Sequence, residues 1–184
     1  MQLRISTGKY KNKKLKVADP TLPVRERVKL AVFSILEDKV IDAKCLDLYA
    51  GSGSLGFEAL SRGAKSCVFI EQNKQAIGCL LENKDNIFAS NEDEKDCVEI
   101  TRADGVKYVS NTDEYYDIIF LDPPYDASDR HIIKMIEGIL NKDGVLIFFH
   151  HKKDKYNVSD INENLKIHDS RIYGITQVDF IVRK

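Results

Sequence analysis

Apolar residues along the chain follow two different spacings in turn. Between residues 24 and 36 they recur every three or four positions, which is the spacing of an amphipathic helix. After that helix, short apolar runs of strand length alternate with segments that return to helical spacing. The expected strands are residues 44–50, 65–71, 97–101, 115–121 and 144–149. The further expected helices are residues 53–63, 73–88 (capped by Asn73), 105–110 and 128–140 (capped by Ser128).

Strands that alternate with helices predict right-handed βαβ units and a mostly parallel sheet covered by helices on both faces. Two more β segments, residues 165–173 and 177–184, end the chain and favour an antiparallel hairpin at the edge of the sheet. We therefore expect an α/β fold with a seven-stranded sheet in one domain over residues 1–184. Residues 1–37 are expected to form a basic N-terminal extension and the first helix, and residues 38–184 the core.

The composition narrows the class of protein. The chain has 184 residues, of which 43% are hydrophobic, and this suits one buried core. It has no run of 18 apolar residues, and its first residues lack the apolar region of a secretory signal, so we expect a cytoplasmic protein without a membrane span. The four cysteines have no CxxC spacing and are expected to be reduced structural residues.

The net charge of −1 conceals a basic start. Residues 1–30 hold nine Lys or Arg against two acidic residues, which leaves 19 basic and 27 acidic residues in the rest of the chain. A basic segment on an acidic body favours a polyanionic partner that is met at one end, although the same charges also suit an ordinary solvated segment. The acidic stretch at residues 91–96 is predicted to be a solvated loop.

Three glycines mark the turn between the first strand and the helix that follows. Gly51 can adopt dihedrals barred to other residues, Gly53 lets the backbone approach a ligand, and Gly56 permits close packing of helix on strand. Glu71 ends the next strand, where a carboxylate can accept hydrogen bonds from ribose hydroxyls. This combination predicts a cofactor that contains adenosine, with a purely structural glycine turn as the alternative. No GK[ST] follows the turn, which excludes a P-loop.

Asp47 narrows the choice of cofactor, because it lies at the end of the same strand, four residues before Gly51. A second carboxylate repels the pyrophosphate of a dinucleotide but attracts a cation in a partly dry cleft. S-adenosyl-L-methionine carries both an ammonium and a sulfonium group, and is therefore the expected cofactor. Asp104 ends the third strand, where it can accept a hydrogen bond from the adenine amine, cap the helix that follows, or do both.

The fourth strand ends in the sequence Asp-Pro-Pro-Tyr at residues 122–125. Pro123 and Pro124 remove two backbone donors and leave carbonyls as the local polar groups. This set complements a planar base with an exocyclic NH2 group: Asp122 and the Pro123 carbonyl accept its two hydrogens, and Tyr125 covers the ring face. The alternative is a strand that simply ends at a Pro-Pro turn.

These blocks resemble a known family. DPPY is similar to the catalytic motif of SAM-dependent methyltransferases that act on exocyclic nitrogens of nucleic-acid bases. Nearly the whole chain resembles the bacterial small-subunit (16S) ribosomal RNA guanine-N2 methyltransferases of the RsmD type, through ISTGKYKNKKL, LDLYAGSGSLGFEALSRGA, FLDPPY and YGITQVDFIVRK. The resemblance implies a Rossmann-like class I methyltransferase domain that uses S-adenosyl-L-methionine and acts on ribosomal RNA or a small ribosomal subunit particle.

Site residues follow from the same resemblance by position. The implied cofactor contacts are Asp47, Ala50, Gly51, Ser52, Gly53, Glu71, Gln72 and Asp104. The implied catalytic element is Asp122, Pro123, Pro124 and Tyr125. The expected phosphate contacts are Lys9, Lys11, Lys13, Lys14, Arg25 and Arg27. No metal is expected, and the enzyme is expected to be a monomer.

The chain departs from the family pattern at three places. Leu22-Pro23-Val24 stands where the family has Arg-Pro-Thr, so this chain cannot make any contact that the Arg or Thr would make. Asn12 replaces a usual glycine, which is mild because Asn tolerates left-handed dihedrals. His150 replaces a usual glutamate near the end of the fifth strand. None of the four histidines is assigned a role.

Three other functions remain open on the sequence. Adenine-N6 or cytosine-N4 methylation of DNA or another RNA uses the same pair of acceptors, but enzymes of that kind generally carry a separate recognition domain. A nicotinamide-dependent oxidoreductase would share the glycine turn, although Asp47 argues against it. A non-catalytic RNA-binding module would need only the basic segment and a disused pocket.

Overall fold

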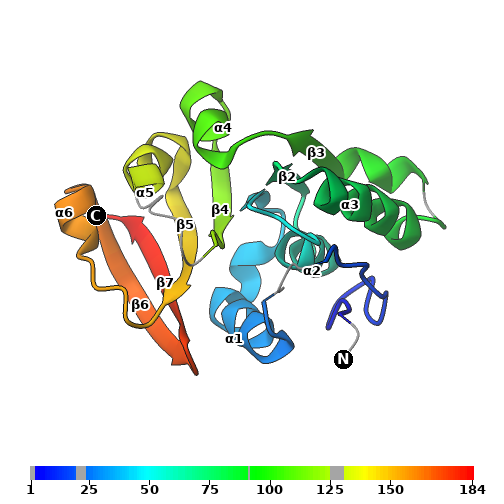
Figure 1. Ribbon diagram of the computed structural model, residues 1–184, viewed down its shortest axis with the longest axis horizontal. Coiled ribbons are helices and arrows are strands. Elements are labelled where there is room, and N and C mark those ends of the chain that lie inside the picture. Colours follow the sequence, from blue (N-terminus) through cyan, green and yellow to red (C-terminus); the bar gives the residue numbers. More distant parts are fainter. Residues whose placement is uncertain (1–2, 20–23, 91, 125–130) are drawn as a thin grey trace.

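The computed structural model describes residues 3–19, 24–90, 92–124 and 131–184, and its centre is a seven-stranded sheet in the order β3-β2-β1-β4-β5-β7-β6 (Figure 1). The strands are β1 Lys44–Leu48, β2 Ser66–Glu71, β3 Val98–Arg102, β4 Tyr116–Leu121, β5 Leu140–His151, β6 Leu165–Tyr173 and β7 Thr176–Arg183. The first five strands pair in parallel, and β7 pairs antiparallel with both β5 and β6. The predicted mostly parallel sheet with an antiparallel C-terminal hairpin is confirmed.

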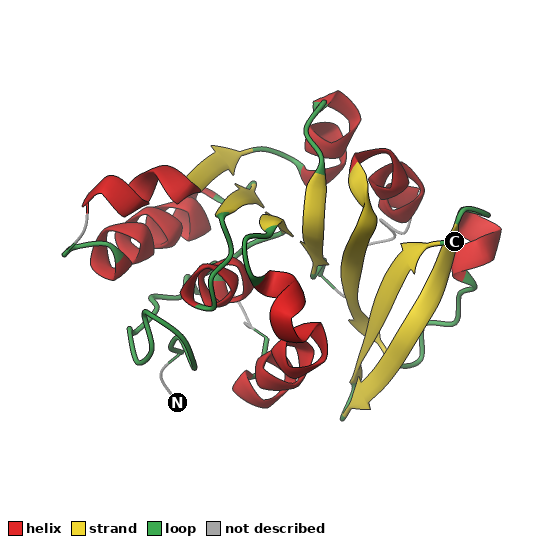
Figure 2. Ribbon diagram, turned by 180° about the vertical axis from the view of Figure 1, so that it is seen from behind, coloured by secondary structure: helices red, strands yellow, loops and turns green. Residues whose placement is uncertain are grey.

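Helices cover both faces of the sheet (Figures 1 and 2). Apolar side chains of three helices pack with one set of strand residues, and those of three others pack with the alternate set, as expected where successive side chains point to opposite faces. The helices on the first face are α1 Glu26–Leu36, α2 Ser54–Ser61 and α3 Lys74–Ile87. Those on the second face are α4 Gly105–Asn111, α5 His131–Ile136 and α6 Val158–Ile161. Three 3-10 helices complete the described elements: η1 Glu37–Val40, η2 Glu92–Cys97 and η3 Glu137–Ile139.

Two local predictions about helices are confirmed. The side chain of Asn73 caps α3 by accepting hydrogen bonds from the backbone N–H groups of Gln75 at 2.8 Å and Ala76 at 3.1 Å. Gly56 lets α2 lie directly on β2, because a Cβ atom there would come within 2.3 Å of the Phe69 ring. The close packing at Gly56 therefore helps to determine the position of α2 on the sheet after the glycine turn.

Some segments differ from the sequence prediction. The acidic stretch expected as a solvated loop contains η2, where Glu94 accepts hydrogen bonds from Lys9 and Tyr10. The fifth strand begins at Leu140 rather than at residue 144, because Leu140 pairs with Tyr116 ahead of a bulge in the ladder. The helix before it is correspondingly shorter, and its expected cap, Ser128, lies outside the described residues. Helix α6 was not predicted.

Residues 3–19, which we call the N-terminal arm, fold back on themselves and lie against α2 and α3 (Figure 1). An isolated bridge joins Arg4 to Lys14, and the turn between them contains Asn12 with φ 70°. That left-handed conformation is the one that Asn was expected to tolerate in place of glycine. Gly8, with φ 85°, lies so close to the Ser61 carbonyl that a Cβ atom would come within 1.8 Å of its oxygen.

A buried carboxylate on α2 anchors this arm. Glu58 is fully buried and accepts hydrogen bonds from the backbone N–H groups of Ser6 at 2.8 Å and Thr7 at 3.1 Å. Its ion-pair partners are Lys29 of α1, at 2.9 Å and equally buried, and Arg62, at 3.0 Å. Lys29 therefore belongs to the core and not to the basic surface on which the sequence count had placed it.

Over the described ranges, no helix is both long enough and apolar enough to cross a membrane. The same residues contain no cluster of three His, Cys, Asp or Glu side chains placed to hold a metal ion. All four cysteines are described and all are free; Cys45, Cys67 and Cys79 are buried.

Candidate active site

The site is organised by the direct pairing of β1 and β4, which lie side by side in the middle of the sheet (Figure 1). Their register pairs Asp47 with Phe120 and Leu48 with Leu121. Asp122 follows Leu121 and lies two residues beyond Phe120, so its side chain starts from the same face as that of Asp47. Strand order reverses between these two strands, which is the point where α/β sheets bind ligands.

Asp47 is a buried carboxylate, 2% exposed. Its Oδ2 accepts a hydrogen bond of 2.9 Å from the backbone N–H of Gly56, in the first turn of α2. Burial raises the pKa of Asp47 well above its ordinary value, the Gly56 N–H opposes this, and the charges of Asp122 and Glu71 raise the pKa further. The carboxylates at the ends of the two neighbouring strands therefore both act on Asp47.

The glycine turn, residues 50–53, adopts backbone conformations that suit its composition. Gly51 has φ 54° and Gly53 has φ 75°. The positive φ expected of Gly51 is confirmed. At Gly53 packing also requires a glycine, because a Cβ atom there would come within 2.6 Å of Phe57 and 2.7 Å of Leu80. Ala50, just before Gly51, and Ser52, between the two glycines, are both buried. Tyr49, just before the turn, has φ 58°, which is a costly conformation for a bulky residue and marks a strained strand end that the sequence did not reveal.

Glu71 ends β2 beside this turn. Its Oε2 accepts a hydrogen bond from the Gly51 N–H at 2.9 Å, and its Oε1 accepts one from the Asn73 N–H at 2.8 Å. Each oxygen keeps a second lone pair for a ribose hydroxyl. Gln72 follows as an exposed residue, and Asp104 caps α4 by accepting from the Lys107 N–H at 3.0 Å. The capping alternative for Asp104 is thus confirmed, and its second carboxylate oxygen remains available for another donor.

Asp122 is the least satisfied acid of this group. Burial raises the pKa of Asp122 to about 7. Within the described part of the chain, no side-chain or backbone donor makes a hydrogen bond to its carboxylate. The next two residues, Pro123 and Pro124, have no N–H to offer. Tyr125, the fourth member of the expected catalytic element, lies outside the described residues.

This arrangement fits a cationic ligand. Asp47 and Asp122 lie on one face, both have raised pKa values, and Glu71 adds a third acid at the next strand end. A positive group between them would favour the ionised carboxylates that burial alone disfavours. The ammonium and sulfonium groups of S-adenosyl-L-methionine have this charge, while a pyrophosphate would add to the repulsion. The residues present therefore fit this cofactor.

The expected phosphate contacts divide into two groups. Lys9 pairs with Glu94 at 2.5 Å, and Lys13 donates to the Asn86 carbonyl at 2.9 Å, so both are held against the body of the protein. The others are exposed, and their side chains make no hydrogen bond or ion pair with any residue that the structure describes. This exposed group is Lys11, Lys14, Arg25 and Arg27. Leu22 and Pro23, where the family pattern has Arg and Pro, lie outside the described ranges.

Sequence reasoning missed a buried polar network at the end of β5. His150, 2% exposed, stacks on Phe148 and places Nε2 3.0 Å from Oδ2 of Asp179 on β7. Tyr156 also donates to Asp179, at 2.6 Å. His150 therefore has a buried acid as its partner, and a signal for it in the sequence was the Asp at an inward position of the apolar strand β7.

Two open surface depressions lie away from these acids. One, of about 310 Å³, lies between the N-terminal arm and α3. The other, of about 460 Å³, lies at the amino ends of β1, β4 and β5. Neither depression is lined by Asp47 or Asp122. The candidate site is therefore located by its carboxylates and by the ends of the strands, and not by the size of a cavity.

Comparisons with known proteins show the family of the chain. A family model described as "Conserved hypothetical protein 95" matches residues 3–182. The ribosomal RNA small subunit methyltransferase D of Haemophilus influenzae is 34% identical over 158 residues, which cover 84% of this chain and 81% of that protein. A solved putative methyltransferase from Escherichia coli is 26% identical with a TM-score of 0.86, over 100% of this chain and 99% of that one. A putative methyltransferase solved in complex with SAH shares the fold, with a TM-score of 0.62 at 17% identity over 80% of this chain and 48% of that chain.

The family match spans nearly the whole chain, and the structural match extends from the N-terminal arm to the C-terminal hairpin. The acids at the strand ends suit the cationic cofactor of such enzymes. The chain therefore belongs to the RsmD-type family of methyltransferases, and its cofactor is S-adenosyl-L-methionine.

Proposed function

We propose that this protein methylates the exocyclic N2 of a guanine in small-subunit ribosomal RNA. The observation that carries the proposal is the pairing of β1 with β4, which places Asp47 and Asp122 on one face at adjacent strand ends. The name of the Haemophilus influenzae relative supports the choice of ribosomal RNA. We take residues 1–184 as one methyltransferase domain that acts as a monomer, with residues 1–37 as its basic extension and first helix.

The cofactor would be held by the tips of β1, β2 and β3. When bound, S-adenosyl-L-methionine supplies a methyl group that its sulfonium charge activates. The buried carboxylate of Asp47 and the residues of the glycine turn, Ala50 to Gly53, would hold the cationic end. Glu71 has lone pairs left for the ribose hydroxyls, Asp104 has a free oxygen for the adenine amine, and exposed Gln72 lies beside them.

Asp122 and Pro123 would orient the target amine. The lone pair of guanine N2 is delocalised into the ring, so the amine is a weak nucleophile. Hydrogen bonds from its two N–H groups to the Asp122 carboxylate and the Pro123 carbonyl favour a pyramidal nitrogen whose lone pair points toward the cofactor. The ionised Asp122 then stabilises the positive charge that develops on that nitrogen, and the nitrogen loses one proton after the methyl group has been transferred. No donor among the described residues bonds to the Asp122 carboxylate, which supports its availability for this contact.

The RNA would be held mainly through its phosphates. The exposed cations expected to position the RNA are Lys11, Lys14, Arg25 and Arg27. Lys9 and Lys13 belong to the same N-terminal arm as Lys11 and Lys14, but their side chains are held against the protein. A base that is stacked in RNA must be turned outward to reach Asp122. We propose that Tyr125 and Pro124 replace part of the lost stacking, which is worth about 1–3 kcal/mol per base on an aromatic ring.

The test is transfer of a radiolabelled methyl group to ribosomal RNA from a strain that lacks this protein, followed by nuclease digestion and nucleoside analysis. We expect label in N2-methylguanosine from small-subunit RNA. Label in N6-methyladenosine or N4-methylcytidine would show that the enzyme methylates the amine of adenine or cytosine instead of guanine. Label only in DNA would reject RNA as the substrate. An RNA that binds tightly without methyl incorporation would leave only the non-catalytic binding module.

A further inference from the structure

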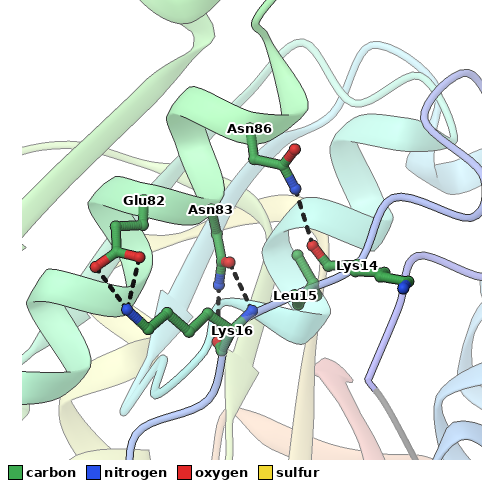
Figure 3. A pocket seen from close by; sticks show the side chains of 6 residues that line it. All are labelled: Lys14, Leu15, Lys16, Glu82, Asn83 and Asn86. Atoms are coloured by element: carbon green, nitrogen blue, oxygen red, sulfur yellow. Dashed lines mark hydrogen bonds and ion pairs between the residues drawn. The ribbon is translucent and has the colours of Figure 1, made fainter.

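Asn83 on α3 is a buried amide that contacts two parts of the proposed site at once. Asn83 is only 2% exposed. Oδ1 accepts a hydrogen bond from the Lys16 N–H at 2.7 Å, and Nδ2 donates to the Lys16 carbonyl at 3.0 Å (Figure 3). The second hydrogen of Nδ2 goes to the Ser52 carbonyl, also at 3.0 Å. Lys16 belongs to the N-terminal arm and Ser52 to the glycine turn, so one side chain joins the two.

Both ends of this link are tightly held. Ser52 is 3% exposed and lies between Gly51 and Gly53, whose positive φ angles fix the direction of the turn. A buried carbonyl needs a donor, and Asn83 supplies it for Ser52. On the other side, the Asn83 amide pairs with both the N–H and the C=O of Lys16, as a neighbouring strand would. A shift of Lys16 is therefore passed to the glycine turn through a single rigid group.

A second asparagine on the same helix makes only half of this link. Asn86 donates to the Lys14 carbonyl at 3.1 Å and is on the exposed side of the same contact (Figure 3). Asn86 therefore holds the arm without the contact to Ser52 that Asn83 makes. Removing either side chain loosens the arm, but only removal of Asn83 also frees the glycine turn. The two residues form a natural pair of test and control.

We propose that Asn83 is a positioning residue that couples RNA binding at the N-terminal arm to cofactor binding at the glycine turn. Lys14, an exposed cation expected to contact phosphate, lies two residues from Lys16, so an RNA that binds the arm also acts on the contacts between Lys16 and Asn83. By linkage, RNA then raises the affinity for the cofactor by the same factor by which the cofactor raises the affinity for RNA. This coupling rests on the proposed function, because it requires that the arm binds RNA.

The experiment measures the dissociation constant of sinefungin, a non-reactive analogue of S-adenosyl-L-methionine, by calorimetry with and without a saturating small-subunit ribosomal RNA transcript. The proteins compared are the wild type, Asn83→Ala and Asn86→Ala. We expect the RNA to tighten sinefungin binding by about fivefold or more in the wild type and in Asn86→Ala. In Asn83→Ala we expect the ratio to fall to about one, which a purely stabilising side chain would not cause once the variant is folded.

Three results would overturn the inference: a wild-type ratio of one, an Asn83→Ala ratio equal to that of the wild type, or an Asn86→Ala ratio that falls as far as that of Asn83→Ala. If Asn83→Ala does not fold, Asn83→Asp keeps the volume and the acceptor atom but removes both donated bonds, and the same ratios apply. Methyl transfer by the same wild-type preparation is measured in parallel. Active enzyme without coupling rejects only the role of Asn83, whereas absence of RNA binding and methyl transfer rejects the proposed function as well.

Discussion

Asp122 follows β4 and Asp179 lies on β7, with β5 between the two strands. Burial raises the pKa of Asp122 to about 7. Burial acts on Asp179 in the same direction, but hydrogen bonds from four side chains outweigh it and lower the pKa of Asp179 to about 2. The donors are His150, Ser170, Tyr156 and Gln177.

The contrast shows how the same residue type can serve the fold or a ligand. The acceptor atoms of Asp179 are used by the protein, so this residue ties the C-terminal hairpin to β5. Asp122 is followed by two prolines that cannot donate, and among the residues that the structure describes no other group donates to its oxygens, which suits a group that arrives from outside. A carboxylate at a strand end whose pKa is raised by partial burial is thus a better indicator of a site than a buried ion pair.

Replacing Asp122 should have the largest effect on activity. In Asp122→Ala we expect methyl transfer to ribosomal RNA to fall by about 10³-fold, because the amine loses both its orientation and the charge that stabilises its product. Affinity for S-adenosyl-L-methionine should change little, and the melting temperature should stay the same or rise, since a poorly solvated carboxylate is removed. Single-turnover rates and thermal melts check this. Turnover within tenfold of the wild type would remove Asp122 from the mechanism.

Replacing Asp179 should reverse this profile. In Asp179→Ala we expect the free energy of unfolding to fall by about 3–5 kcal/mol, because His150 loses its charged partner in a buried site. The pKa of about 2 lies below the ordinary 3.8, so the stabilisation is present above pH 3.8 and is lost as the pH falls through 2. Urea denaturation at neutral pH measures the loss.

The control for Asp179 is Asp169→Ala on the same hairpin. Asp169 pairs with Arg171 at 3.1 Å, and the Arg171 side chain is 57% exposed. This surface pair is expected to contribute no more than about 1 kcal/mol. Equal losses in the two variants, or a folded Asp179→Ala protein whose catalysis falls as far as that of Asp122→Ala, would break the distinction between the two kinds of acid.

The pH dependence of methyl transfer should report the raised pKa of Asp122. The ionised form is the one that accepts hydrogen bonds from the amine, so kcat/KM should rise with pH and level off above about 7. The free energy of unfolding should change with pH in the opposite direction. The pKa of Asp122 is higher in the folded protein than in the unfolded chain, so ionisation of Asp122 lowers stability as the pH rises from 3.8 toward 7. A kcat/KM profile that is flat from about pH 5.5 to about pH 8.5 would contradict the assignment.

The smallest expected effect is on RNA affinity, and it concerns the lysines of the N-terminal arm. The side chains of Lys11 and Lys14 make no hydrogen bond or ion pair with the described residues, whereas those of Lys9 and Lys13 are held by Glu94 and the Asn86 carbonyl. We expect the double variant Lys11→Ala/Lys14→Ala to bind ribosomal RNA about tenfold more weakly and to lower the slope of log affinity against log salt by about 0.7–0.9 for each phosphate that is no longer neutralised. Fluorescence anisotropy at several salt concentrations measures both.

The matched control for these lysines is Lys39→Ala/Lys142→Ala. This pair lines the depression at the amino ends of the strands, at the opposite edge of the sheet from Asp122. Its RNA affinity and salt slope should equal those of the wild type. If both double variants lose the same affinity, RNA binding follows net charge and the exposed cations of the N-terminal arm have no special place in it.

The parts of the site that could be predicted from the sequence are those that local pattern determines. Glu71 and Asp122 each end an apolar run and Asp47 lies near the end of one, and strands that end together in a parallel sheet bring such residues to one edge. The remaining features depend on contacts between distant segments. His150 meets Asp179 29 residues away, and Asn83 meets Lys16 67 residues away, so no spacing in the chain announces either pair.

Charge alone also misled the sequence prediction about the basic extension. Lys29 looked like part of a basic surface, but the helical stripe of α1 carries it inward to Glu58. The acidic stretch at residues 91–96 looked like solvent-facing loop, but Glu94 receives Lys9 and Tyr10 from the arm. In both cases the partner comes from a segment whose position only the tertiary fold determines.

The most direct test is a crystal structure of the protein with bound sinefungin, whose amine stands where the sulfonium methyl group of S-adenosyl-L-methionine would be. The account predicts that the ligand lies on the glycine turn with its nucleoside toward Glu71 and its amine facing the Asp122 carboxylate, leaving space for one base between them. A ligand that occupies a separate cavity, or whose amine points away from Asp122, would contradict the claim that the ends of β1 and β4 form a single methyl-transfer site.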